Sequence, residues 1–147
     1  MGISLYDVSV AGFIQTLTSV AGFLEKGRAH FAGQEGALAE IVEMRIAPDM
    51  LPFRFQILSV VHHSRGAIEG AKAGLFAPPG GGPKDYAGLQ QLVADALDML
   101  PFVAEDFLMS FSIPNLHFHA TTAYGMLRAK GVPLGKRDYL GRMRMKK

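Results

Sequence analysis

The chain has 147 residues, 49% of them apolar, and contains no cysteine. This length fits one domain with a buried core, so we predict a single domain over residues 1–147. The lack of cysteine excludes disulfides and thiolate chemistry. The formal net charge of +2 conceals an acidic body, because residues 1–127 carry seven Lys and Arg against twelve Asp and Glu, while residues 128–147 carry eight against one. We therefore expect residues 131–147 to form a basic C-terminal tail.

The segment near the N-terminus raises the question of export, because the stretch from Val8 to Leu24 carries no formal charge. A signal peptide would place basic residues before the apolar run, but Asp7 stands there, and polar residues such as Gln15 and Thr16 interrupt the run. No other stretch approaches the length and purity of a membrane span. We expect a soluble, cytoplasmic protein with no membrane partner.

Apolar residues recur at helical spacing in the first half of the chain. Ser9 is the predicted N-cap of a first long helix, and a glycine-rich break separates it from a short helix over residues 37–44. The buried seam of the first helix follows four-three-four spacing: Phe13, Leu17, Val20 and Leu24. The second long helix is expected to begin at Pro48, because proline suits the first turn of a helix, and to end near Gly74.

The second half opens with the Pro- and Gly-rich segment 78–83, the clearest loop in the chain. A third helix is expected from Asp85 to Pro101. The fourth should begin near Ala104, and Pro114 should kink or split it, because proline disrupts a helix interior. No segment alternates apolar and polar residues over a useful length, so we assign no sheet. The predicted fold class is all-α: a four-helix bundle with a kinked or split last helix and an irregular C-terminal tail.

A polar stripe is predicted on the second long helix. Asp49, Gln56 and His63 are spaced seven residues apart, which returns to almost the same helical face if the helix already runs at Asp49. An acid, an amide and an imidazole would then share one face. The alternative is an exposed first-turn acid, favoured by the helix dipole, with Gln56 and His63 as residues at the edge of the bundle.

The last long helix offers a second polar pair. Asn115 and His119 are four residues apart and share a face that we expect to point into the bundle. His117 lies on a nearly opposite side, so the His-x-His pair is not a helical metal chelate. His62 and His63 point about 100° apart on a helix, so that one can face the core and the other solvent. A buried His119 could also be a core residue with satisfied hydrogen bonds.

The basic tail could attract phosphate, nucleic acid or an anionic lipid surface, and Lys136 and Arg137 are the candidate anion-binding residues. The tail lacks any known nucleic-acid motif, so we consider nucleic-acid binding unlikely. The chain has no Gly-x-x-x-x-Gly-Lys-Ser/Thr phosphate loop and no nucleophile elbow of a serine hydrolase.

Four motifs resemble those of a known family. They are Ser4–Val8 (SLYDV), Arg45–Met50 (RIAPDM), Pro114–Tyr124 (PNLHFHATTAY) and Gly131–Gly141 (GVPLGKRDYLG). Together they resemble an uncharacterised bacterial domain family of the DinB/YfiT-like superfamily, over nearly the whole chain. The family has no established function to carry over.

The resemblance implies a four-helix bundle that often forms homodimers. Many members of the superfamily hold a divalent metal with one histidine from the second helix and a His-x-x-x-His pair from the last long helix. Asn115 and His119 fill the places of that pair here, and the second helix offers Asp49, Gln56, His62 or His63, so the ligand set is incomplete. The resemblance also implies a connection before the fourth helix that is longer than residues 99–102. Either this member of the family has a shortened connection, or residues are missing from the sequence.

Three functional hypotheses follow, and the sequence does not decide whether the protein is an enzyme. The first is a homodimeric bundle with a polar pocket and an incomplete set of metal ligands. This pocket would contain Asp49, Gln56, His63, Asn115, His119 and Tyr124. Its candidate ligands His119, Asn115 and Asp49 could hold Zn, Ni, Mn or Fe weakly. The second is a metal-dependent hydrolase or transferase of the DinB/YfiT type, with a metal-bound water as nucleophile. The third is a protein that binds a small ligand or a partner without catalysis.

Overall fold

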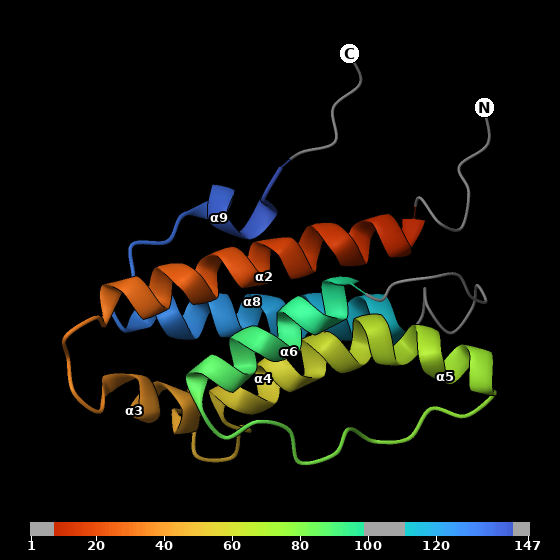
Figure 1. The fold of residues 1–147 in the computed structure, drawn as a ribbon, viewed down its shortest axis with the longest axis horizontal. Helices are drawn as coiled ribbons and strands as arrows, with labels where there is room; N and C mark the ends of the chain where they lie inside the picture. The colour runs from red at the N-terminus through yellow and green to blue at the C-terminus, as the bar shows by residue number, and fades with distance from the viewer. Residues whose placement is uncertain (1–7, 99–110, 143–147) are drawn as a thin grey trace.

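The computed structural model describes residues 8–98 and 111–142, and the regular elements within these ranges are all helical (Figure 1). Four rods run side by side, and two short helices lie at their edges. The rods are α2 (Val10–His30), a continuous run of α4 (Phe53–Val61), η1 (His62–Gly66) and α5 (Ala67–Ala73), α6 (Tyr86–Asp98) and α8 (Ile113–Ala129). The short helices are α3 (Ala37–Glu43) and α9 (Lys136–Leu140). The predicted all-α bundle is confirmed.

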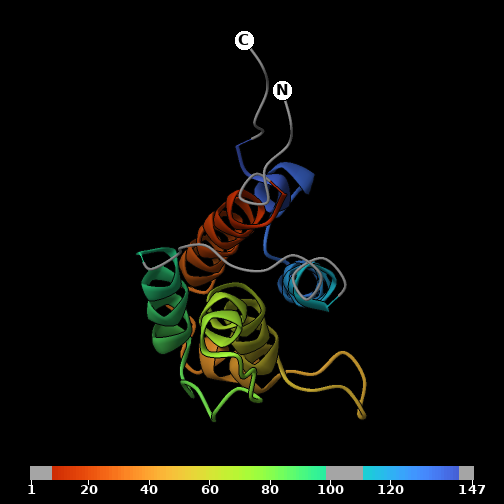
Figure 2. The same ribbon diagram turned by 90° about the vertical axis from the view of Figure 1, so that its right-hand side faces the viewer.

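The core lies between the four rods, as the view along their axes shows (Figure 2). Helix α4 packs against α8 and α6, and α2 packs against α6, α8 and α9. The predicted seam of the first helix is confirmed, since its members have no exposed surface: Phe13, Leu17, Val20 and Leu24. Burying a side chain of this size stabilises the fold by roughly 1.5–3 kcal/mol, so this seam anchors α2 on the bundle.

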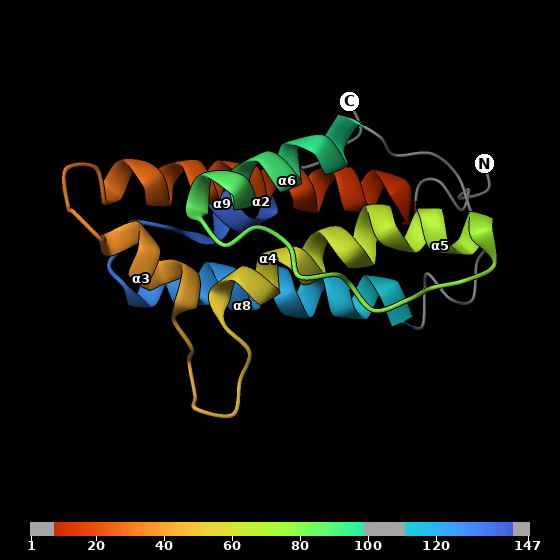
Figure 3. The same ribbon diagram turned by 60° about the horizontal axis from the view of Figure 1, so that its bottom comes forward.

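The second long rod begins later than the sequence analysis predicts. Helix α4 starts at Phe53, with Pro52 as its N-cap in an extended conformation. Residues 44–52 form a loop that projects from the bundle (Figure 3), and Arg45 donates a hydrogen bond to the Met50 carbonyl across it. The predicted start at Pro48 is wrong because a helix from there would place Pro52 in its interior, where proline removes a hydrogen bond and clashes with the preceding turn.

The same rod contains a π-helical turn, η1, between α4 and α5. A π turn inserts one extra residue into the helical ladder, and such turns occur often at functional sites. The rod ends at Ala73, and Gly74 follows with a φ of 68°, a conformation that glycine adopts without strain. The predicted end near Gly74 is confirmed. Residues 75–85, which we call the strap, then run back along the rod to α6.

The C-terminal segment is irregular only in part. Residues 136–140 form α9, which packs on α2: Gln15 donates a hydrogen bond to the Leu140 carbonyl, and Lys26 pairs with Asp138. Helix α8 begins at Ile113, directly after the π-helical residues Phe111 and Ser112, and Pro114 lies in its first turn.

Several predictions fall on residues that the structure does not describe. Residues 99–110 contain three of them: the predicted end of the third helix at Pro101, the short connection at 99–102 and the start of the fourth helix near Ala104. The last residues of the basic tail lie in 143–147. Within the described ranges, no helix combines the length and the apolar character that crossing a membrane requires.

A glycine in α2 is expected to be essential for packing. A Cβ at Gly27 would lie 2.3 Å from the hydroxyl of Tyr86, which donates a 2.9 Å hydrogen bond to the Leu24 carbonyl. We predict that Gly27→Ala lowers the free energy of unfolding by about 1–3 kcal/mol, because the Tyr86 ring must move within a packed core. Chemical denaturation followed by circular dichroism measures the change.

Gly22→Ala is the matched control, since a Cβ at this exposed position on the same helix meets nothing within 4 Å. It should raise stability by about 0.5–1 kcal/mol through helix propensity alone. Tyr86→Phe removes the hydroxyl and should relieve part of the Gly27→Ala penalty in the double variant. Equal effects of the two glycine changes would contradict this account of the packing.

Candidate functional site

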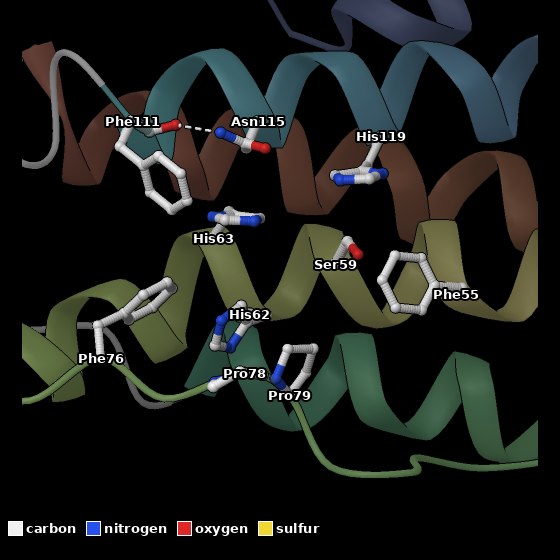
Figure 4. A pocket seen from close by; sticks show the side chains of 10 residues that line it. All are labelled: Phe55, Ser59, His62, His63, Phe76, Pro78, Pro79, Phe111, Asn115 and His119. Carbon is white, nitrogen blue, oxygen red and sulfur yellow. Dashed lines mark hydrogen bonds between the residues drawn. The ribbon is translucent and has the colours of Figure 1, made fainter. Parts of the chain in front are cut away.

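A pocket opens between α8 on one side and α4, η1 and the strap on the other (Figure 4). Its volume is about 400 Å³. We call it the histidine pocket, because three imidazoles line it together with aromatic rings, prolines and two small polar side chains. Its described lining residues are Phe55, Ser59, His62, His63, Phe76, Pro78, Pro79, Phe111, Asn115 and His119.

A chain of hydrogen bonds orients His119. The buried amide of Gln56 donates from Nε2 to the Leu51 carbonyl over 2.9 Å, and its Oε1 lies 2.7 Å from Nδ1 of His119. The Leu51 carbonyl can only accept, so the amide nitrogen must face it and the amide oxygen must face His119. Nδ1 of His119 therefore carries the proton, and Nε2 keeps a free lone pair.

His63 extends from η1 toward α8 and is only 7% exposed. Its ring lies nearly parallel to that of His119, with an interplanar angle of 8° and centroids 5.9 Å apart. The rings of Phe111 and His63 make a T-shaped contact, with centroids 5.2 Å apart. Its Nδ1 is sealed from solvent and has no hydrogen-bond partner among the residues that the structure describes. This is uncommon for a buried polar atom and marks a place where a function is worth seeking.

His62 points toward the strap, away from His119 (Figure 4). Its ring stacks on Phe76 with centroids 4.1 Å apart. The prediction that one of the adjacent histidines faces the core is confirmed by the burial of His63. The expectation that the other faces solvent is only half right, because His62 is half-buried beneath Phe76.

Burial keeps the imidazoles of the pocket neutral. Loss of hydration lowers the pKa of His63 to about 4, and positive charge on His62 or His119 would lower it further. Burial likewise lowers the pKa of His119 to about 4 and lowers that of His62. At neutral pH the pocket therefore presents uncharged rings that can donate or accept hydrogen bonds.

The predicted pair on α8 lies as the spacing indicates. Asn115 and His119 both line the pocket, and Asn115 donates from Nδ2 to the Phe111 carbonyl. His117 lies on another side of the helix, where its Nδ1 is 3.3 Å from the hydroxyl of Tyr139 in α9. The prediction that His117 and His119 do not form one chelate is confirmed.

Two predicted pocket residues lie elsewhere. Asp49 is exposed in the loop before α4, so it does not share a helical face with Gln56 and His63, and its predicted place in the pocket is wrong. The predicted place of Tyr124 in the pocket is wrong as well, because its ring packs against Phe23 and Tyr139. Tyr124 follows His119 by five residues on α8, and this spacing directs the two side chains to different sides of the helix.

The candidate anion site on α9 is exposed. Lys136 and Arg137 both face solvent beside Asp138, whose carboxylate already binds Lys26 and the Gly135 amide. Anion binding there stays a prediction.

The aromatic walls of the pocket and the strap residues are functional-site residues that the sequence pattern does not predict. Phe55 directly precedes Gln56, which the sequence does mark as a pocket residue. The ring centroids of Phe55 and His119 are 6.0 Å apart. Phe76 stands just before the Pro-rich segment that was recognised only as a loop. Proline restricts the backbone, and that rigidity was the one signal that residues near it could form a fixed wall.

The residues present do not fit the three-histidine metal site that the resemblance implies. Among the side chains that the structure describes, no three His, Asp or Glu groups converge in a way that could hold a metal ion. Asn115 binds the Phe111 carbonyl through its nitrogen, and Asp49 lies outside the pocket. The predicted ligand set of His119, Asn115 and Asp49 is therefore not brought together.

Comparisons with known proteins agree with this architecture. The crystal structure of a DinB family member protein from Shewanella denitrificans, at 1.83 Å resolution, matches with a TM-score of 0.80 and 26% sequence identity, covering 97% of this chain and 95% of that chain. No curated protein matches the chain. A family model described as "Domain of unknown function (DUF1993)" matches residues 5–106 and 97–140. Since these segments span most of the chain, the protein belongs to the DUF1993 family and has a DinB-like helical fold.

Proposed function

We propose that the histidine pocket binds a small aromatic molecule, and that this binding is the function of the protein. The observation that carries the proposal is the oriented imidazole of His119. Its Nδ1 proton is committed to Gln56, so its Nε2 lone pair is available as an acceptor in a pocket walled by aromatic rings. An acceptor that lies in a half-buried side chain of a pocket is a recognition group for a ligand donor.

The size and lining of the pocket support this function. Ligand pockets range from about 300 to 1,000 Å³, and they combine mostly apolar walls with a few fixed polar groups. The histidine pocket, with its volume of about 400 Å³, has this composition. Phe55, Phe76 and Phe111 supply the apolar walls, while the histidines and Asn115 supply the polar groups.

The alternative of a metal-dependent hydrolase or transferase has less support. Such an enzyme needs a fixed set of protein ligands around the metal. The described residues supply His63 and His119 as neighbouring donors, but neither carries a carboxylate partner that would strengthen it as a ligand.

Indole is a suitable probe of binding, because it is an uncharged aromatic N–H donor and the chain contains no tryptophan. Fluorescence of indole, excited beyond the tyrosine band, should change on titration with the protein. We expect His119→Phe to weaken binding by roughly tenfold, the effect of one lost hydrogen bond of about 1.4 kcal/mol.

His117→Phe is the matched control, since His117 is on the same helix but contacts Tyr139 outside the pocket. It should leave indole binding unchanged. Ser59→Leu should abolish binding by filling the pocket. The proposal is wrong if the wild-type protein does not bind indole, or if the two histidine variants lose it equally.

The neutral histidines also predict a pH dependence of stability. Because the pKa values of His63 and His119 are about 4 in the folded protein, and about 6.5 in an unfolded chain, the unfolded state binds more protons between these values. Stability should be fully present above pH 6.5 and should fall as the pH drops toward 4. Each histidine contributes at most about 1.4 kcal/mol per pH unit, and His119 less because it is partly exposed.

Urea unfolding at pH 7.5, 6.0 and 5.0 measures this slope. The double variant His63→Phe with His119→Phe should show a clearly shallower decline between pH 6.5 and 5.0 than the wild type. An unchanged slope in the double variant would assign the acid sensitivity to other groups.

Self-association is the remaining proposal about assembly. Ile46 and Phe118 are 59% and 58% exposed, and they line a groove with Pro114 on the outer face of α8. Burying such side chains against a second copy would supply the apolar core of a dimer interface. Sedimentation velocity at micromolar concentration should show a dimer that Phe118→Glu converts to monomer. Leu75→Glu, at a 72% exposed position on the strap, should not; a wild-type monomer would overturn the proposal.

A further inference from the structure

The two neighbouring imidazoles of the histidine pocket, His63 and His119, have different hydrogen-bonding environments. His119 is an acceptor there, because Gln56 fixes its proton on Nδ1 and leaves the Nε2 lone pair open. His63 has a different environment, in which Nδ1 is sealed from solvent and has no partner. The position of the proton on His63 therefore decides what it offers to a ligand.

The proton of His63 belongs on Nε2. A buried N–H without an acceptor is rarer in proteins than a buried acceptor without a donor, because the orphaned donor loses more. With Nδ1 sealed and unpartnered, the lower-energy tautomer leaves a bare lone pair there and carries the proton on Nε2. Nε2–H of His63 is then the group that can donate to a molecule in the pocket.

The rings of His63 and His119 are close neighbours in the pocket. Their centroids are 5.9 Å apart and their planes nearly parallel, at 8°. The nitrogens of an imidazole donate and accept in the plane of the ring, so a group that carries a donor and an acceptor on the same carbon would meet both histidines at their ring edges. Phe55 and Phe111 make T-shaped contacts with His119 and His63 respectively, so aromatic rings lie next to both imidazoles.

The charge of the lining restricts the ligand further. None of the described residues that line the pocket is Lys, Arg, Asp or Glu, so an ionised ligand would find no counter-charge there. Burying an unpaired carboxylate costs several kcal/mol, and the His119 lone pair would repel it. A neutral carbonyl group with an attached NH₂ meets both histidines with complementary atoms.

We propose that the histidine pocket is selective for uncharged aromatic primary carboxamides, whose carbonyl accepts from Nε2–H of His63 while the amide NH₂ donates to Nε2 of His119. This inference rests on the proposed function and names its ligand class. It concerns binding only, and it assigns His63 and His119 as the residues that determine specificity.

Competition against indole tests the selectivity on the folded wild-type protein. Benzamide should displace indole at a concentration roughly tenfold lower than benzoate, which has a charge, or N,N-dimethylbenzamide, which has no donor, since each change removes about one hydrogen bond. Equal displacement by all three would overturn the ligand class while leaving aromatic binding intact. Failure of indole itself to bind would instead remove the proposed function and this inference together.

A second measurement reads the tautomers directly on the wild-type protein, with variants used only to assign the signals. Long-range ¹H–¹⁵N correlation spectra of the histidine rings at pH 7.5 should show the proton of His119 on Nδ1 and that of His63 on Nε2. His117→Phe and His62→Phe assist the assignment, because each removes one set of ring signals from outside this pair. A proton on Nδ1 of His63, or on Nε2 of His119, would overturn the complementary pairing.

Discussion

The arrangement of the site depends on one buried amide. Gln56 joins the start of α4 to α8, because its nitrogen is bound by the Leu51 carbonyl and its oxygen by His119. The two contacts leave the amide no alternative orientation, so a neutral side chain fixes both the position of an imidazole and the location of its proton. The fixed tautomer matters for ligand recognition, because it decides which ring nitrogen donates a hydrogen bond and which accepts one.

The π turn places a second imidazole opposite the first. Within η1, His63 points to α8 and His62 points to the strap (Figure 4). The next residue, Ser64, donates a hydrogen bond from its hydroxyl to the Val60 carbonyl. Consecutive histidines can thus serve two walls of one pocket, one as a polar group and one as a platform for Phe76. The extra residue of a π turn carries an energetic cost that a regular helix would avoid, which fits a local role in building the pocket.

Local sequence patterns were sufficient for much of this structure and insufficient for its pocket walls. The four-residue spacing of Asn115 and His119 placed both on one inward face, because α8 is regular across them. The seven-residue spacing of Asp49 and Gln56 misled, since periodicity has meaning only inside a helix and Pro52 fixes where α4 begins. Phe76 could not be placed in advance, because its contact with His62 depends on the path of the strap after α5, which no local spacing encodes.

The replacement at one position accounts for the chemistry that the site supports. The DinB/YfiT-like resemblance implied a pair of histidines on the last long helix, and Asn115 stands in the first place of that pair. A side-chain amide is a weak metal ligand but forms good hydrogen bonds with backbone groups. Here the amide nitrogen of Asn115 donates a hydrogen bond to the Phe111 carbonyl. With one imidazole absent and no carboxylate on the described walls, the remaining rings do not make up the ligand set that the resemblance implies. Burial keeps them neutral, so the proposed recognition of a ligand relies on hydrogen bonds rather than on charge.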